Sequence, residues 1–156
     1  MSSLNFVSWN VKGIGHVVKR KKILTFLKKE KVSIALLQET HLSNTEHLKL
    51  KRDWVGQIYF SSFGPNRRGT AILVHKNVPF ILEKEDYDPE GRYILVTGFI
   101  FGQHLTILNI YAPNEDCPRF MSRMVLLFNQ HCKGFGLIAG DFNCILNSIS
   151  KNGFTF

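Results

Sequence analysis

The first 37 residues place an amphipathic segment between two apolar runs, and this order limits the folds open to the chain. Residues 4–9 alternate between apolar and polar side chains, as in a strand that enters a core. Residues 18–30 have helical spacing, with lysines on the outer face. The expected buried face of this helix consists of Ile23, Leu24, Phe26 and Leu27. Residues 32–37 are continuously apolar, which is typical of a strand buried on both faces. Together these segments predict a βαβ crossover.

The sequence pattern after residue 37 predicts more strands and one more helix. Strand-like runs occupy residues 57–61, 70–75, 92–99 and 105–111. Turn sequences rich in Gly, Pro and Asn separate these runs and predict an antiparallel meander. A second helix is expected after a cap at Asp116 or Cys117, with Pro118 in its first turn and Gly134 after its end. Its expected buried face consists of Phe120, Met124, Leu127, Phe128 and His131. With a last strand at residues 137–142, the order predicts an α/β fold whose mixed sheets are covered by helices.

The chain is basic, and its charges are unevenly distributed. Its 156 residues, enough for one domain, include 20 Lys and Arg against 12 Asp and Glu, a formal net charge of +8. Basic residues crowd residues 19–31, whereas acidic residues crowd residues 83–90. We therefore expect a basic surface patch opposite an acidic loop. Such a patch attracts polyanions, although a solvated helix face explains the charge run equally well.

The cysteines and the hydropathy pattern favour an intracellular protein. Cys117, Cys132 and Cys144 form neither a C-x-x-C pair nor a zinc spacing, and are interpreted as buried or semi-buried thiols in a reducing compartment. His41 and His47 lack an H-E-x-x-H arrangement, so zinc is not expected. There is no signal peptide and no apolar run of membrane-spanning length. We expect a location in the nucleus or the cytoplasm, no secretion and no membrane partner.

Four polar clusters follow apolar, strand-like runs. They are Ser8-Trp9-Asn10, Leu37-Gln38-Glu39-Thr40-His41, Asn109-Ile110-Tyr111-Ala112-Pro113-Asn114 and Gly140-Asp141-Phe142-Asn143. The ends of strands are where sheets present residues to ligands. Asn10, Glu39, Tyr111, Asp141 and Asn143 thus provide metal ligands, a base, amide donors and a phenol, the groups needed to cut a phosphodiester. Each alone also fits a structural role, such as a turn residue at Asn10 or a solvated carboxylate at Glu39.

The order of these clusters resembles the exonuclease-endonuclease-phosphatase superfamily. Within it, Q-E-T-H, N-I-Y-A-P-N and G-D-F-N together resemble the endonuclease domain of LINE-type retrotransposons, which is related to apurinic endonucleases. The resemblance runs from about residue 4 to residue 147. It implies two packed mixed sheets with helices outside, a four-layer sandwich. Because the family's domain is longer, it also implies that residues 1–156 are a single domain incomplete at its C-terminus.

The resemblance implies Mg²⁺-dependent nicking of DNA, with Mn²⁺ as the alternative cation. Glu39 would be a metal ligand, and Asn10 would complete or orient the metal shell. Asp141 would align or deprotonate the attacking water, while Asn143 donates to the phosphate and Tyr111 reaches a phosphate oxygen. The partners would be DNA and the remainder of a retroelement polyprotein. Candidate DNA contacts are Lys19, Arg20, Lys21, Lys22, Arg67 and Arg68.

The sequence departs from the family pattern in two places. Lys12 stands where some relatives have an acidic residue, and no Ser-Asp-His cluster follows Asn143 within the 156 residues. We therefore expect impaired catalysis. A catalytically inactive remnant that binds nucleic acid or a protein is the alternative reading, and a phosphoinositide, sphingomyelin or RNA substrate is a third.

Overall fold

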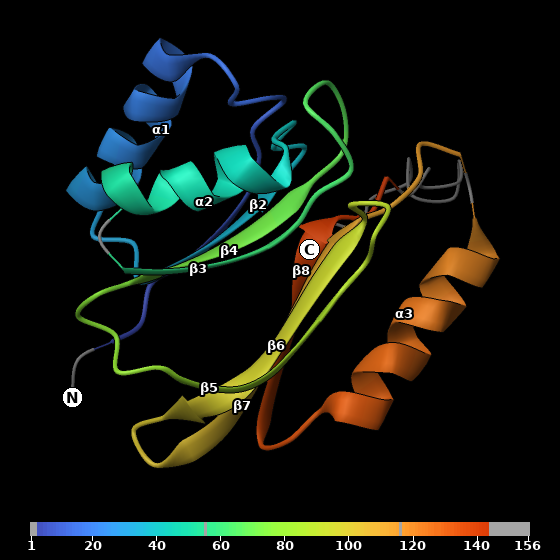
Figure 1. Cartoon of the computed structure of the whole chain (residues 1–156). Helices are drawn as coiled ribbons and strands as arrows, with labels where there is room; N and C mark the ends of the chain where they lie inside the picture. The colour runs from blue at the N-terminus through green and yellow to red at the C-terminus, as the bar shows by residue number, and fades with distance from the viewer. Residues whose placement is uncertain (1–2, 55, 116, 144–156) are drawn as a thin grey trace, which may run out of the picture.

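The protein is a sandwich of two four-stranded sheets with helices on both outer faces (Figure 1). The computed structural model describes residues 3–54, 56–115 and 117–143. In spatial order, the first sheet contains β1 (Phe6–Asn10), β2 (Ile34–Gln38), β4 (Thr70–His75) and β3 (Gly56–Ser61). The second contains β5 (Ile81–Tyr87), β6 (Tyr93–Ile100), β7 (Gln103–Tyr111) and β8 (Phe135–Asp141). Helices α1 (Val17–Lys29) and α2 (Asn44–Asp53) lie against the first sheet, and α3 (Pro118–His131) against the second. The predicted four-layer α/β sandwich is confirmed.

The predicted βαβ crossover is present at the start of the chain. Strands β1 and β2 are parallel neighbours joined by α1, and Asn10 is the register partner of Gln38. The residues that follow these strands therefore emerge at the same edge of the sheet. The strand and helix limits differ from the predicted ones by one or two residues.

The prediction of one antiparallel meander is wrong, because the chain changes sheets between β4 and β5. Strands β3 and β4 pair in the first sheet, whereas β5, β6 and β7 pair in the second. The connection carries Val78 and Phe80, which are buried between the sheets, so the crossing is anchored by apolar contacts. Glu83, Glu85 and Asp86, expected in an acidic loop, instead belong to the edge strand β5, which solvent reaches along most of its length.

Helix α2 was absent from the sequence predictions. It begins with a capping box, in which Ser43 accepts from the Glu46 amide and Glu46 accepts from the Ser43 amide. Its buried residues are only His47 and Leu50. The apolar stripe is thus too narrow for hydrophobic periodicity to indicate a helix.

Apolar side chains fill three layers of core. Ile34, Leu36, Ile72, Val74, Ile94, Val96 and Ile107 pack between the two sheets. Under α1 the buried residues are Ile23, Leu24 and Leu27; Phe26 is 46% exposed and contacts the edge of Trp9, so its predicted burial is wrong. Under α3, Phe120 and Met124 are buried, and Leu127, Phe128 and His131 are half-buried.

Two further sequence expectations concern the cysteines and membrane spans. Cys117 and Cys132 are half-buried free thiols, and Cys144 lies outside the described residues, as does the expected cap Asp116. Among the described residues, no helix combines the length and apolar character that crossing a bilayer requires.

A buried hydrogen-bond network joins the two sheets. Asn109 of β7 donates from Nδ2 to the carbonyl oxygens of Leu37 and Ala71 in the first sheet, each at 2.9 Å. Gln38 donates from Nε2 to Asn109 Oδ1 at 2.8 Å and to Ser8 Oγ at 3.1 Å. A buried side-chain amide destabilises the fold unless it is hydrogen-bonded. The network therefore favours one alignment of the two sheets relative to each other.

We predict that Asn109→Ala lowers the free energy of unfolding by about 2–4 kcal/mol, because it leaves the Gln38 amide and two strand carbonyls without this partner. Urea denaturation measures the change. The matched control Asn129→Ala, at an exposed site of α3, should change stability by less than about 0.5 kcal/mol. A loss below about 1 kcal/mol for Asn109→Ala would contradict a structural role for the network.

His47 is a buried neutral imidazole between two hydroxyls. Its Nε2 lies 2.9 Å from Thr40 Oγ1, its Nδ1 lies 2.7 Å from Ser62 Oγ, and its ring stacks on Phe60. Burial lowers the pKa of His47 from 6.5 to about 4, against the opposing charge of Glu46. The ring therefore supports the loop after β2 in its neutral form.

We predict that His47 makes the fold less stable in acid. Below about pH 6.5 the His47 imidazole is protonated in the unfolded chain, whereas in the folded chain it is protonated only below about pH 4. Between pH 7.5 and pH 5, wild type should therefore lose about 2 kcal/mol more stability than His47→Gln. Urea titrations at both pH values measure this difference. Equal pH dependence in the two proteins would show that His47 is protonated in the folded state.

Candidate active site

Four strands end at one edge of the sandwich and bring the predicted site residues there. Asn10 ends β1, and Glu39 directly follows β2. Tyr111 and Asp141 end β7 and β8, which are parallel neighbours with these two residues in register. Strands β1 and β8 contact each other across the two sheets, which joins the two halves of the site.

Asn10 holds two carboxylates together. Its Nδ2 donates to Glu39 Oε1 at 2.9 Å and to Asp141 Oδ2 at 2.7 Å. Its Oδ1 accepts from the backbone amide of Lys12 at 3.0 Å, which forms the tight turn after β1. The amide of Asn10 therefore holds next to Glu39 a residue, Asp141, that lies 131 positions after Asn10 in the sequence.

Tyr111 lies beside the carboxylates and is mostly buried, with 7% of its surface exposed. The Glu39 carboxylate lies near its hydroxyl. Burial and this carboxylate raise the pKa of Tyr111, while Arg92 acts in the opposite direction. The phenol thus keeps its proton at neutral pH. The Arg92 guanidinium lies over the tyrosine ring at 5.1 Å from its centre.

Asn143 is tied to the strand ends by both its backbone and its side chain. Its backbone amide donates to Asp141 Oδ1 at 3.1 Å, and its Nδ2 donates to the Ala112 carbonyl at 2.8 Å. The Asp141 carboxylate therefore has one oxygen on Asn143 and the other on Asn10. These bonds fix the rotamer of Asp141.

His41 also belongs to the site, although sequence reasoning gave it no role there. Its Nε2 lies 3.3 Å from Glu39 Oε2. Glu39 thus has Asn10 on one carboxylate oxygen and His41 on the other. The available signal was its place in the Q-E-T-H cluster, two residues after Glu39.

The loops around the site have unusual backbone conformations. Non-glycine residues with positive φ there are Lys12 (47°), Glu39 (51°), His41 (54°), Arg68 (57°) and Asn143 (44°). Left-handed backbone costs roughly 1–2 kcal/mol at each such residue, and it persists only where surrounding contacts hold it. Here backbone bonds do so: the amides of Thr40 and His41 donate to the carbonyls of Gly69 and Arg68.

Gly140 shows a separate backbone requirement next to Asp141. Its φ is +143°, and a Cβ atom there would lie 2.0 Å from the Ile110 carbonyl oxygen. The glycine of the G-D-F-N cluster therefore allows β8 to lie close against β7, which sets the position of Asp141.

The predicted DNA contacts differ in their surroundings. Lys19 Nζ donates to the Lys12 carbonyl at 2.9 Å, so it lies next to the turn after β1. Lys21 and Lys22 are exposed on α1, whereas Arg20 faces Asp53, with 3.8 Å between Nε and Oδ2. In the β3–β4 loop, the guanidinium groups of Arg67 and Arg68 lie 4.8 and 4.4 Å from the centre of the Phe63 ring.

The donor set fits a hard divalent cation. Carboxylate oxygens of Glu39 and Asp141 lie around the same amide nitrogen, and Mg²⁺ is commonly held by one or two carboxylates and water. The Asn10 oxygen accepts one hydrogen bond and has a second lone pair for a cation. Among the described residues, there is no group of three or more His, Cys, Asp or Glu side chains with metal-binding geometry. Such a cation would therefore rely on water for most of its ligands.

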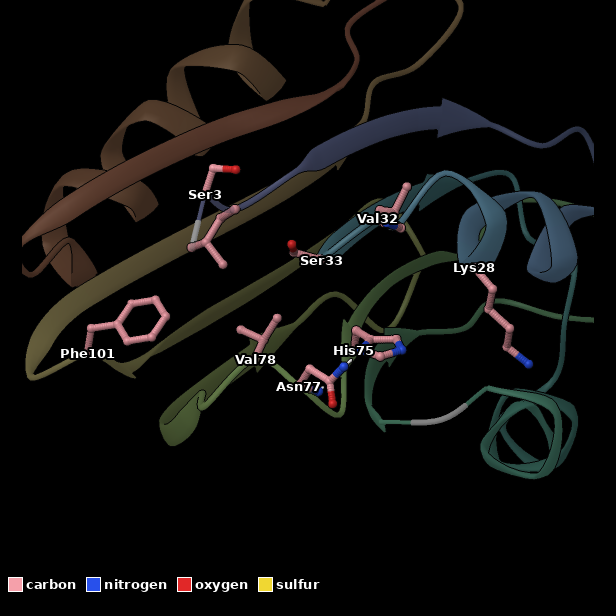
Figure 2. Close-up of a pocket in the computed structure, with 10 residues that line it drawn as sticks. Ser3, Lys28, Val32, Ser33, His75, Asn77, Val78 and Phe101 are labelled. Carbon is pink, nitrogen blue, oxygen red and sulfur yellow. Dashed lines mark hydrogen bonds between the residues drawn. The ribbon is translucent and has the colours of Figure 1, made fainter. Parts of the chain in front are cut away.

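A pocket of about 380 Å³ lies at the opposite end of the first sheet, where β2 begins (Figure 2). Its polar groups serve local structure: Lys28 Nζ donates to the Asp53 carbonyl at 2.6 Å, and His75 Nδ1 accepts from the Asn77 amide at 3.2 Å. None of the predicted site residues lines this pocket. This pocket is therefore separate from the edge with Asn10, Glu39 and Asp141.

Two curated proteins are similar to the chain in sequence. It is 24% identical over 154 residues to the transposon TX1 uncharacterized 149 kDa protein of Xenopus laevis, covering 96% of the chain and 12% of that protein. It is 26% identical over 116 residues to an exodeoxyribonuclease of Bacillus subtilis, covering 72% and 44%. The chain thus spans less than half the length of either relative.

Solved structures share the fold. The crystal structure of TDP2 from C. elegans matches with a TM-score of 0.67 and 24% identity, covering 89% of this chain and 48% of that one. The endonuclease domain of TRAS1, a telomere-specific non-LTR retrotransposon, matches with a TM-score of 0.63 and 12% identity, covering 90% and 61%.

The family assignment rests on nearly the whole chain. The sequence profile of the Endonuclease/Exonuclease/phosphatase family matches residues 7–155, which include all four polar clusters and every residue of the site described above. The two-sheet sandwich and its strand-end carboxylates agree with that match. The chain belongs to the Endonuclease/Exonuclease/phosphatase family.

Proposed function

We propose that the chain is the endonuclease part of a retroelement protein and hydrolyses a phosphodiester of DNA with Mg²⁺, or alternatively Mn²⁺. The observation that carries the proposal is the pair of hydrogen bonds from Asn10 Nδ2 to Glu39 and Asp141. Two carboxylates close together at strand ends serve both to hold a cation and to activate water. Similarity to a transposon protein and to an exodeoxyribonuclease supports the choice of DNA as substrate.

The site residues have separate roles in this proposal. Glu39, with Asn10, would hold the cation, which when bound supplies Lewis-acid stabilisation of phosphate charge. Asp141 is fixed by Asn10 and Asn143, so it can orient a water molecule and accept its proton. Tyr111, protonated at neutral pH, donates to a phosphate oxygen, and the Asn143 amide stabilises developing negative charge.

The proposal includes an intracellular location. The free thiols Cys117 and Cys132 support a reducing compartment, the nucleus or the cytoplasm.

A second candidate function is nucleic-acid binding without cleavage. The backbone amide of Lys12 donates to Asn10 Oδ1, and Lys19 Nζ donates to the Lys12 carbonyl, so two basic residues lie at the turn after Asn10. Such charges favour a bound phosphate and disfavour a cation. Nicking assays separate the two candidates.

We predict that nicking of supercoiled plasmid in Mg²⁺ falls at least about 10²-fold in Glu39→Gln and in Asp141→Asn, because each change removes a charge but keeps the shape. Agarose gels measure the nicked fraction. Glu30→Gln, an exposed position after α1, is the matched control and should nick at the wild-type rate. Nicking that survives both site changes comes from a contaminant, and no nicking by wild type favours the binding-only candidate.

We predict that the exposed lysines of α1 contribute to DNA affinity. The triple change Lys19→Gln, Lys21→Gln and Lys22→Gln should reduce the slope of log affinity against log salt by about 1–2, because each phosphate contact contributes about 0.9. Fluorescence anisotropy with a labelled duplex measures the slope. The control removes three charges from α2, at Lys49, Lys51 and Arg52. An unchanged slope in the α1 variant would show that these lysines do not contact DNA and only form a solvated helix face.

A further inference from the structure

Four arginines from three separate parts of the chain line one pocket of about 500 Å³. Arg68 lies in the β3–β4 loop and Arg92 directly precedes β6. Arg119 and Arg123 lie one turn apart on α3, so their side chains share a face of that helix. We refer to this feature, which Asp88 and Glu90 also line, as the arginine pocket.

The carboxylates of the arginine pocket are already engaged. Both oxygens of Asp88 accept backbone amides, from Glu90 at 3.1 Å and from Arg92 at 3.2 Å, so this side chain holds the turn before β6. Glu90 is largely exposed and pairs with Arg68 at 3.2 Å. Within residues 3–54, 56–115 and 117–143, no carboxylate forms an ion pair with Arg92, Arg119 or Arg123.

The guanidinium groups of the arginine pocket repel one another. Burial and the nearby charge of Arg68 lower the pKa of Arg92. Arg92 is held over the Tyr111 ring, and its guanidinium approaches the Tyr111 carbonyl at 3.5 Å, so it does not turn away into solvent. An anion in the pocket would offset the repulsion, and planar guanidinium groups suit phosphate oxygens particularly well.

The arginine pocket adjoins the candidate active site through shared residues. The hydroxyl of Tyr111 lies near the Glu39 carboxylate, and the ring of Tyr111 lies under the Arg92 guanidinium. The carbonyl of Arg68 accepts the backbone amide of His41, so the loop with Arg68 also borders Glu39. A strand whose phosphate lies at Glu39 would therefore pass Tyr111 and reach the arginines.

We propose that the arginine pocket binds a backbone phosphate of the nucleic-acid strand. This phosphate would neighbour the phosphodiester that the proposed function places at the cation site of Glu39 and Asp141. The proposal rests on the proposed function only for the identity of the ligand as a nucleic acid. Arg119 and Arg123 supply exposed donors from α3, and Arg92 supplies charge at the base of the pocket. The pocket thus holds the strand on the far side of Tyr111 from the carboxylates.

The test measures DNA binding in a Glu39→Gln background, where cleavage does not interfere. Fluorescence anisotropy with a labelled duplex compares that chain with one that also carries Arg119→Gln and Arg123→Gln. We expect the slope of log affinity against log salt to fall by about 1 and affinity to fall roughly 10-fold. The control removes two charges at Lys51 and Arg52 on α2 and should keep the slope. Circular dichroism confirms that every variant is folded.

The outcomes separate this proposal from the proposed function. An unchanged slope in the arginine variant, an equal fall in the control, or no DNA binding by the parent chain would overturn the proposal. Changing both arginines to lysine should keep most of the slope, because the charge is retained. If inorganic phosphate or a polyglutamate peptide binds in an arginine-dependent way while DNA does not, the pocket serves a small anion or a protein instead. If DNA binding depends on the arginines but the wild-type chain does not nick DNA, only the proposed function is contradicted.

Discussion

The hydrogen bonds that Asn109 makes with Gln38, Leu37 and Ala71 hold the two sheets in the relative position that forms the site. Glu39 directly follows Gln38, and Tyr111 lies two residues after Asn109 on the same face of β7. Because Asn109 points into the first sheet, Tyr111 does too, which brings its hydroxyl near Glu39. A sliding of the sheets would break the amide network and separate these two groups. The core supplies most of the folding energy, but apolar contacts alone do not select this alignment.

The site depends on a second amide for its charge balance. Two carboxylates held close together repel each other, and Asn10 offsets this by donating to both. His41 contacts Glu39 from the other side, while Asn143 contacts Asp141. Each carboxylate therefore has fixed partners on both oxygens. Positive backbone φ angles at several of these residues show that the loops are held in place by their bonds against their own preference.

Sequence patterns predicted correctly those parts of the fold in which the local pattern of apolar and turn residues matches the burial seen in the structure. The βαβ crossover, the two-sheet sandwich and the placement of polar clusters at strand ends were accessible because apolar runs and turn residues mark them. Helix α2 was missed because only His47 and Leu50 face the core, and β5 because its acidic side chains lie on an exposed edge. Phe26 was misplaced because it packs against Trp9 of the edge strand β1, where solvent still reaches it. The contact of His41 with Glu39 depends on left-handed backbone, which no periodicity reveals. The roles of the site residues and the single-domain organisation remain predictions.

Gly140 shows that the geometry of the site can be lost while all its polar groups remain. A methyl group at this position meets the Ile110 carbonyl, so β8 must move away from β7 and take Asp141 with it. A variant altered only there keeps every carboxylate, amide and phenol of the site, yet holds them at the wrong spacing. The arrangement of these groups therefore depends on a residue that contributes no side chain, through the space it leaves between two strands.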